Sequence, residues 1–160
     1  MKYFTIFFFL LMPVLLQAQE KPDSPLALVI KEQDSLLFER GFNQCDTKYL
    51  ESVTHPELSA YYEKGEAQSR AKYFEDVQKY HCGDATKKQI RKIVPNSLET
   101  FSLYDKGVLN GAVQSGSIDL YLQEPGKPDV KTGTSKFTNL WLLVNGKWLL
   151  KEAMSFGHQE

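Results

Sequence analysis

The stretch Lys136–Phe156, KFTNLWLLVNGKWLLKEAMSF, decides the fold of this chain, because it predicts a long β-hairpin. Its centre, Asn145-Gly146, is the strongest short turn signal, since both turn positions need a positive φ that Asn and Gly tolerate. The apolar and aromatic residues on either side of this turn are typical of strands. The sequence therefore predicts two long antiparallel strands joined by a two-residue turn.

A two-residue turn sets the pairing by counting, so that Trp141 faces Leu150 and Asn139 faces Glu152. Side chains alternate across a strand, so one face holds the odd-numbered residues of the first strand and their partners. The members of that face are Phe137, Asn139, Trp141, Leu143, Trp148, Leu150, Glu152, Met154 and Phe156. A carboxylate and an amide on an aromatic face are costly to bury unless they bond each other or a ligand. The pair is the best candidate site in the sequence.

Glu152 is therefore a candidate general acid or base, with Asn139 as the residue that orients it. His158 shares strand parity with Glu152 if the strand continues past Gly157, and could pair with that carboxylate. Three other interpretations stay open: a structural hydrogen bond between Asn139 and Glu152, a dimer interface on this face, and a solvent-exposed His158.

The first 18 residues predict a signal peptide. Lys2 is followed by an apolar run from Phe4 to Leu16, and Ala18 offers a small residue for cleavage before Gln19. The run is too short for a comfortable membrane span. We expect an exported protein, periplasmic or secreted, without a stable membrane anchor after cleavage; an uncut N-terminal anchor is the alternative.

Composition favours a single domain and argues against nucleic acid as a partner. Residues 19–23 form a short polar leader, and residues 24–160 are enough for one domain with its own core. With a formal net charge of −1, the chain lacks the excess of positive charge that is typical of nucleic-acid-binding proteins. One short basic cluster, Lys87, Lys88, Arg91 and Lys92, is interpreted as a solvated strand or loop.

The two cysteines, Cys45 and Cys82, permit one intramolecular disulfide. Export to an oxidising compartment favours the bond, and two free buried thiols are the alternative. The three histidines show no metal-ligand spacing, so we predict neither a metal nor a cofactor.

The remaining pattern is three helices followed by strands. Helical spacing and caps predict helices over 24–44, from Asp46, and over 69–82, with a short strand at 58–63 before the third. Strands follow at 90–94, 98–104, 108–123, 134–144 and 147–156. Gly111 and Gly116 inside one strand indicate bends of a strongly curved sheet. This order is typical of an α+β domain with helices on one face of an antiparallel sheet.

Three segments resemble the nuclear transport factor 2-like superfamily, in its SnoaL-like and ketosteroid-isomerase-like branch. They are the helix end Asn43-Gln44-Cys45-Asp46, the turn Tyr62-Glu63-Lys64-Gly65, and the hairpin from Trp141 with its tail to Gln159. The resemblance implies a cystatin-like cone with a pocket, often a homodimer formed through the open sheet face. Enzymes of the superfamily use an Asp or a His–Asp pair in the pocket, and we align no such Asp here. The superfamily includes enzymes and non-enzymes, so fold does not settle the role.

Several residues are candidate pocket-lining groups. Asp119 and Tyr121 share one face of their strand, opposite Ile118 and Leu120, and either face could turn toward the cone. The full set of expected ligand-binding residues is Trp141, Phe137, Met154, Asp119, Tyr121, Tyr62 and His55. His81 lies on an apolar helix face and is interpreted as a core histidine.

The sequence thus predicts an exported domain that binds a small, largely apolar organic molecule in a cone-shaped pocket. The alternatives are an interaction module that pairs subunits or docks a partner through its sheet face, and a metal-independent isomerase or dehydratase using Glu152.

Overall fold

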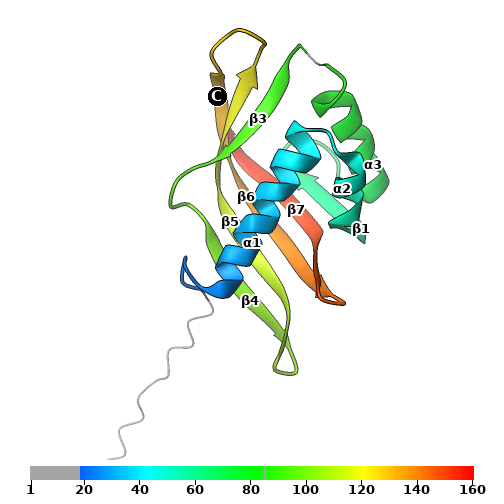
Figure 1. Ribbon diagram of the computed structural model, residues 1–160, viewed down its shortest axis with the longest axis vertical. Helices are drawn as coiled ribbons and strands as arrows, with labels where there is room; N and C mark the ends of the chain where they lie inside the picture. Colours follow the sequence, from blue (N-terminus) through cyan, green and yellow to red (C-terminus); the bar gives the residue numbers. More distant parts are fainter. Residues whose placement is uncertain (1–18, 85) are drawn as a thin grey trace, which may run out of the picture.

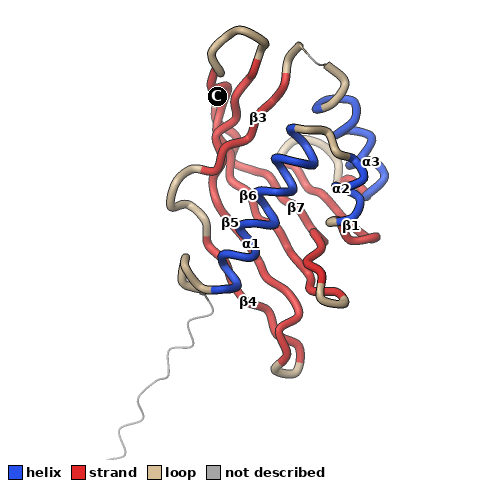
Figure 2. The backbone as a smooth tube through the Cα atoms, viewed as in Figure 1, coloured by secondary structure: helices blue, strands red, loops and turns tan. Residues whose placement is uncertain are grey.

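The computed structural model describes residues 19–84 and 86–160. The predicted signal segment, residues 1–18, lies outside the described residues. The described part forms one layer of helices against one face of a seven-stranded sheet (Figures 1 and 2). No helix in this part of the chain is long and apolar enough to cross a membrane.

Three helical segments begin at the capping residues that the sequence indicates. The helices are α1 (Pro25–Leu36), continued by the π-helix η1 (Leu37–Asn43), α2 (Thr47–Ser52), and α3 (Arg70–Asp76), continued by the π-helix η2 (Val77–His81). The side chains of Ser24, Asp46 and Ser69 each accept a hydrogen bond from a backbone N–H of the first turn. These bonds satisfy donors that a helix N-terminus otherwise leaves unpaired.

The sheet has the strand order β2-β1-β7-β6-β5-β3, with β4 also paired to β5. The strands are β1 (Thr54–Tyr62), β2 (Gln68–Ser69), β3 (Lys88–Ile93), β4 (Glu99–Asp105), β5 (Val108–Gln123), β6 (Val130–Val144) and β7 (Lys147–Gln159). The α+β class is confirmed. The purely antiparallel sheet was wrong, because β1 pairs with β7 in parallel. The sheet is twisted and open and is not curled around α1, so the strong curvature was also wrong (Figure 1). The helices are also not one N-terminal group, since β1 and β2 separate α2 from α3.

The β6–β7 hairpin forms at Asn145-Gly146, both with positive φ, and pairs Trp141 with Leu150 as predicted. Beyond that pair the register shifts by one residue, so that Asn139 pairs with Ala153 and Leu140 with Glu152. Because side chains alternate, an extra residue in one strand changes which of its side chains face the helices. The predicted pairing of Asn139 with Glu152 was therefore wrong.

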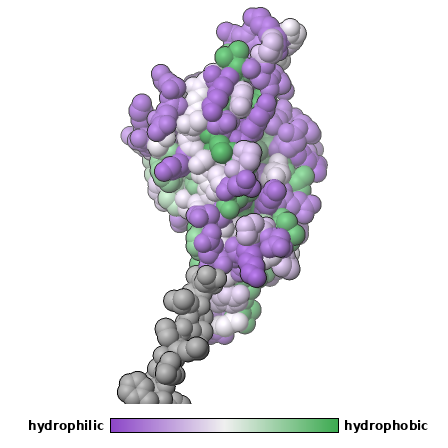
Figure 3. All heavy atoms as spheres, turned by 90° about the vertical axis from the view of Figure 1, so that its left-hand side faces the viewer, coloured by the Kyte–Doolittle hydropathy of each residue, from purple (hydrophilic) through white to green (hydrophobic). Residues whose placement is uncertain are grey.

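The core lies between α1 and the sheet. Trp141 is fully buried and donates from Nε1 to Gln114 Oε1 at 3.2 Å, so its polar atom is satisfied. Its apolar neighbours in the same cluster include Ile30, Leu58 and Leu150. The side of the molecule seen in Figure 3 is mostly hydrophilic, with hydrophobic residues scattered singly.

Candidate functional site

A cavity of about 330 Å³ opens between the helices and the sheet, beyond the part of the interlayer that Trp141 fills. Its aromatic lining residues are Phe38, Phe42, Tyr62, Tyr73 and Phe137. Its polar lining residues are Asn43, His81, Gln89, Arg91, Ser135, Asn139, Ser155 and His158. Both π-helices contribute side chains, and such widened turns occur often at functional sites.

Small side chains on the sheet leave this space empty. Ser135 on β6 and Ala153 and Ser155 on β7 line the cavity. Asn139 pairs with Ala153 and Phe137 with Ser155, so large and small residues face each other across the two strands. The register shift in β7 is what brings Ala153, and not Glu152, to this position.

Arg91 lies at the floor of the cavity, in a buried ion pair with Asp34 behind it. Arg91 Nη1 of β3 lies 2.9 Å from Asp34 Oδ2 of α1, and the two side chains are 9% and 1% exposed. Burial raises the pKa of Asp34 above its ordinary value, and the positive charge of Arg91 opposes that rise. Removing one partner of such a pair leaves an uncompensated buried charge.

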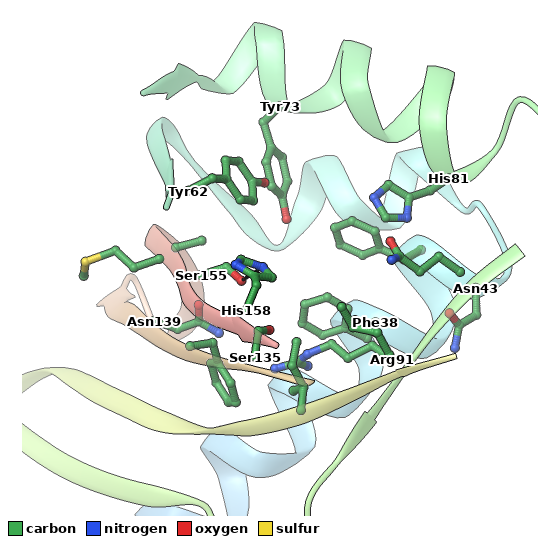
Figure 4. Close-up of a pocket in the computed structure, with 17 residues that line it drawn as sticks. Phe38, Asn43, Tyr62, Tyr73, His81, Arg91, Ser135, Asn139, Ser155 and His158 are labelled. Carbon is green, nitrogen blue, oxygen red and sulfur yellow. Dashed lines mark hydrogen bonds between the residues drawn. The ribbon is translucent and has the colours of Figure 1, made fainter. Parts of the chain in front are cut away.

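The guanidinium of Arg91 is held between two aromatic rings. Its Cζ lies 3.6 Å from the ring centre of Phe38 and 4.4 Å from that of Phe137. Gly116 on β5 makes room for Phe137, because a Cβ at that glycine would lie 2.9 Å from the ring. The rings and the ion pair together fix the plane of the guanidinium. Figure 4 shows Arg91 beside Phe38 at the edge of the cavity.

Two further polar groups lie on β6 beside this pair. Asn139 Nδ2 donates to Asp34 Oδ1 at 3.4 Å, which adds a second contact to the buried carboxylate. Ser135 is 2% exposed, and its Oγ has no hydrogen-bond partner among the described residues. A buried hydroxyl without a partner is costly, so Ser135 is a position where a bound group would be stabilised.

The helical side of the cavity carries ionisable groups that burial keeps neutral. Burial lowers the pKa of His81, whose ring meets Phe42 edge-on at 5.3 Å between centres. Burial also raises the pKa of Tyr73 far above its ordinary value. Near neutral pH these two groups therefore offer hydrogen bonds and no charge.

At the mouth, His158 belongs to a chain of three hydrogen-bonded residues. Glu63 Oε2 accepts from the backbone N–H of His158 at 3.0 Å and lies 3.1 Å from its Nδ1. Ser155 Oγ lies 3.3 Å from His158 Nε2. Gly157 has a φ of +65°, and this left-handed residue turns the chain so that His158 lies over the cavity. The two bonds from His158 lower the pKa of Glu63.

A disulfide joins the ends of the two π-helices. Cys45 follows η1 and Cys82 follows η2, and their Cα atoms are 5.8 Å apart. The predicted bond is confirmed. It ties together the two segments that supply Phe38, Phe42 and His81 to the cavity.

The comparisons with known proteins identify the fold. A scan against protein-family models found no match, and neither did a search of curated proteins. Among solved structures, an NTF2-like protein from Cytophaga hutchinsonii is 16% identical, with a TM-score of 0.59 over 81% of this chain and 95% of that one. The chain has the nuclear transport factor 2-like fold.

Two other solved structures are similar over most of their length. One is described as a putative calcium/calmodulin dependent protein kinase II association domain from Xanthomonas campestris; it is 17% identical, with a TM-score of 0.63 over 83% of this chain and 87% of that one. The other, from Caulobacter vibrioides, has a cystatin-like fold; it is 13% identical, with a TM-score of 0.58 over 79% of this chain and 84% of that one.

Within this nuclear transport factor 2-like fold, part of the predicted site comes together. Five of the predicted residues line the cavity: Phe137, Asn139, Met154, Tyr62 and His158. His158 does pair with a carboxylate, but the partner is Glu63 and not Glu152.

Other predicted positions lie elsewhere. Glu152 does not line the cavity, because the register shift pairs it with Leu140. Trp141 is in the core, and its indole fills the space that a ligand would need. His55 lies in β1, where its Nδ1 accepts from the Glu57 N–H at 3.1 Å, away from the cavity.

Asp119 and Tyr121 were predicted to line the cavity, and this was wrong. The other face of β5, with Ile118 and Leu120, turns toward it. Asp119 bonds Lys131 at 2.8 Å, and Tyr121 lies under the Lys92 ammonium at 4.3 Å. Both therefore have surface partners.

The floor of the site was not predicted from the sequence. Arg91 was assigned to a solvated basic cluster, and Asp34 was not singled out. A usable signal was present: Asp34 lies four residues after Ile30 and three before Leu37, so it falls on the apolar face of its helix. A carboxylate on such a face requires a buried partner.

Proposed function

We propose that this protein binds a small organic molecule with an apolar body in the cavity between its helices and sheet. Small-molecule sites are concave, mostly apolar, and carry a few polar groups that fix orientation. The aromatic lining and the row of hydrogen-bonding groups on β6 and β7 match that description. The protein would act as an exported domain that binds small molecules.

The observation that carries this proposal is the unfilled space itself. A module that only pairs subunits would gain stability by filling its interlayer with side chains, as Trp141 does at the other end. Here Ser135, Ala153 and Ser155 leave the cavity open beside an ordered arginine. A second copy or a partner protein on the outer sheet face would not need that space.

Export belongs to the same proposal. The Cys45–Cys82 disulfide fits an oxidising compartment. The test is N-terminal sequencing of the protein from the envelope and culture fractions of its own host. A mature start at Gln19 supports export, and an intact Met1 in the cytoplasm contradicts it.

Native mass spectrometry of the mature protein from its own host tests ligand binding directly. We expect a discrete extra mass on the wild type that is absent from Ala153→Leu, which fills the cavity. Ser115→Ala is the matched control, because Ser115 lies on β5 outside the cavity and should keep the extra mass. If the wild type is empty and dialysis against host extract adds nothing, the proposal fails.

A second candidate function, proton transfer, is favoured by the Glu63–His158–Ser155 chain. A carboxylate that accepts from Nδ1 leaves Nε2, 3.3 Å from Ser155 Oγ, as the ring nitrogen that accepts a proton, as in general-base sites. If the bound molecule is turned over, His158→Gln should abolish turnover while binding persists. Glu63→Gln should lower the rate less and shift its pH profile. Unchanged turnover in His158→Gln would exclude this role.

Assembly as a homodimer is a further part of the proposal. Alternation places Phe101, Val113, Leu140 and Leu142 on the sheet face away from Trp141, and all four are only half-buried. A half-buried apolar sheet face suits a partner subunit. Sedimentation of wild type against Leu140→Lys tests it: a dimer that becomes a monomer supports the interface, and a wild-type monomer excludes it.

A further inference from the structure

We propose that the ligand carries a carboxylate, seated on Arg91 and Ser135 at the floor of the cavity, with its apolar body between the aromatic side chains above. This inference rests on the proposed function and names the chemical class that the cavity selects. It follows from the charge, the geometry and the unpaired donors of the floor.

The cavity lining carries a positive charge. Among the described residues that line the cavity, Arg91 is the only one with a permanent charge, and none is Asp or Glu. Asp34 lies behind the guanidinium and does not line the space. The two lining histidines, His81 and His158, contribute no negative charge. An anionic group is therefore the one that this lining favours.

The geometry of Arg91 suits a carboxylate. A guanidinium presents N–H groups in a rigid planar fork that matches the two oxygens of a carboxylate. Among described residues its one side-chain hydrogen bond is from Nη1 to Asp34, which leaves other donors available. Because Phe38 and Phe137 hold the plane from both sides, little ordering is needed when a ligand binds.

Ser135 supplies an independent observation. Its hydroxyl is buried, lines the same cavity, and has no partner among the described residues. Figure 4 shows it at the floor, between Asn139 and Arg91 and below His158. A serine hydroxyl can donate to a carboxylate oxygen, and hydrogen bonds to charged groups are the stronger kind. The free hydroxyl and the fixed guanidinium thus meet at one place.

The size of the cavity limits the size of the ligand's apolar body. About 330 Å³ accommodates a one- or two-ring molecule, and aromatic rings line it on both the helix and the sheet side. Planar bodies stack on such rings at low entropic cost. The class is therefore an aromatic or alicyclic carboxylic acid.

Matched probe pairs test the carboxylate. Calorimetry would measure the affinity of the mature protein for 2-naphthoate and 2-naphthamide, and for indole-3-acetate and indole-3-acetamide. Each pair keeps the rings and exchanges the charged group for a neutral one. We expect each acid to bind about tenfold or more tightly than its amide, as for a charged hydrogen bond in place of a neutral one.

Two variants test whether Ser135 and the Asp34–Arg91 pair cause the preference for the acid over the amide. Ser135→Ala removes a hydroxyl that has no protein partner, so the fold should persist while acid binding weakens about fivefold. The double variant Asp34→Leu with Arg91→Met replaces the ion pair by apolar groups of similar size, and the acid-to-amide ratio should fall to about one. Ser115→Ala is the control and should leave both affinities unchanged. If the double variant does not fold, Ser135→Ala still decides the matter.

Three results would overturn the inference. Amides that bind as tightly as acids exclude the carboxylate but leave small-molecule binding intact. An acid preference that survives in Ser135→Ala and in the double variant places the subsite elsewhere. Binding of none of the four probes counts against both this inference and the proposed function, and the native mass spectrum then shows which other ligand class, if any, is retained.

Discussion

The inner face of β6 passes through two different environments. At Trp141 the space between α1 and the sheet is filled, and the indole is fully buried with its N–H bonded to Gln114. Two residues away, Asn139 borders a cavity whose floor holds Arg91, the partner of the buried Asp34. The same strand, the same sheet and the same helical layer thus give a packed core at one end and an open pocket at the other.

The difference comes from the size and polarity of a few inward side chains. Ala112 and Leu150 face Trp141 in the filled end, so a large residue is matched with small and medium partners. In the open end, Ala153 and Ser155 face Asn139 and Phe137, and nothing large enough fills the remainder. The filled end therefore stabilises the fold, whereas the open end leaves a cavity.

The largest expected effect is at the centre of the filled end. Trp141→Ala removes the largest fully buried side chain and leaves Gln114 without its donor, so the free energy of unfolding should fall by about 3–5 kcal/mol. Urea denaturation measures it. Trp148→Ala is the control, since Trp148 is only half-buried near the hairpin turn and should cost clearly less. Equal losses would show that the filled end is not the main source of stability.

The second-largest effect concerns the Cys45–Cys82 disulfide, which joins the two π-helices that line the cavity. The double variant Cys45→Ala with Cys82→Ala removes a crosslink between residues 37 positions apart in the sequence. The chain-entropy model predicts that the free energy of unfolding falls by about 3–4 kcal/mol. Denaturation with and without reductant measures this loss. Reductant should destabilise the wild type by the same amount and leave the variant unchanged. Binding of the proposed ligand should also weaken, because η1 and η2 are no longer joined covalently.

A matched pair of alanines contrasts the two ends directly. Ala112→Leu overpacks the filled end and should destabilise by about 1–3 kcal/mol, whereas Ala153→Leu enters empty space and should cost less than about 1 kcal/mol. Thermal and urea unfolding would measure both. If Ala153→Leu is as costly as Ala112→Leu, the cavity is not a preformed space.

The smallest effect is the pH dependence that His81 contributes. Its pKa in the folded state is lowered by burial, so the unfolded chain takes up the proton first as the pH falls below the ordinary value of 6.5. The stability that neutral His81 provides is present above that pH and is lost as the pH falls through the lowered pKa. His81→Phe should therefore lose less stability than the wild type on acidification. A larger loss in His81→Phe than in the wild type would contradict this role of His81.

Local signals predicted most of the fold. The caps at Ser24, Asp46 and Ser69, the Asn145-Gly146 turn, and β5 over 108–123 are all determined by short-range chemistry. The parallel pairing of β1 with β7 could not be read in this way, because it joins segments far apart in the chain and leaves no local pattern.

The site was less predictable for the same reason. Counting from the turn predicted the right pairs as far as Trp141 and Leu150. The register then shifts by one residue, so that Ala153 takes the place of Glu152 as the partner of Asn139. The partners Asp34 and Arg91 meet only through the tertiary fold, so charge patterns near Arg91 suggested a solvated surface. Whether a side chain is buried cannot be predicted from its sequence neighbours when its partners lie far away in the chain.

The position of β7 has a consequence for how the molecule is made. β7 is the last strand in the sequence, and it lies between β1 and β6 inside the sheet. A growing chain therefore cannot join β1 and β2 to the other strands of the sheet until residues 150–155 have been synthesised. Contacts of such long sequence separation slow folding. The sheet, and with it the pocket that β7 helps to line, forms as one unit only when synthesis of this strand is finished.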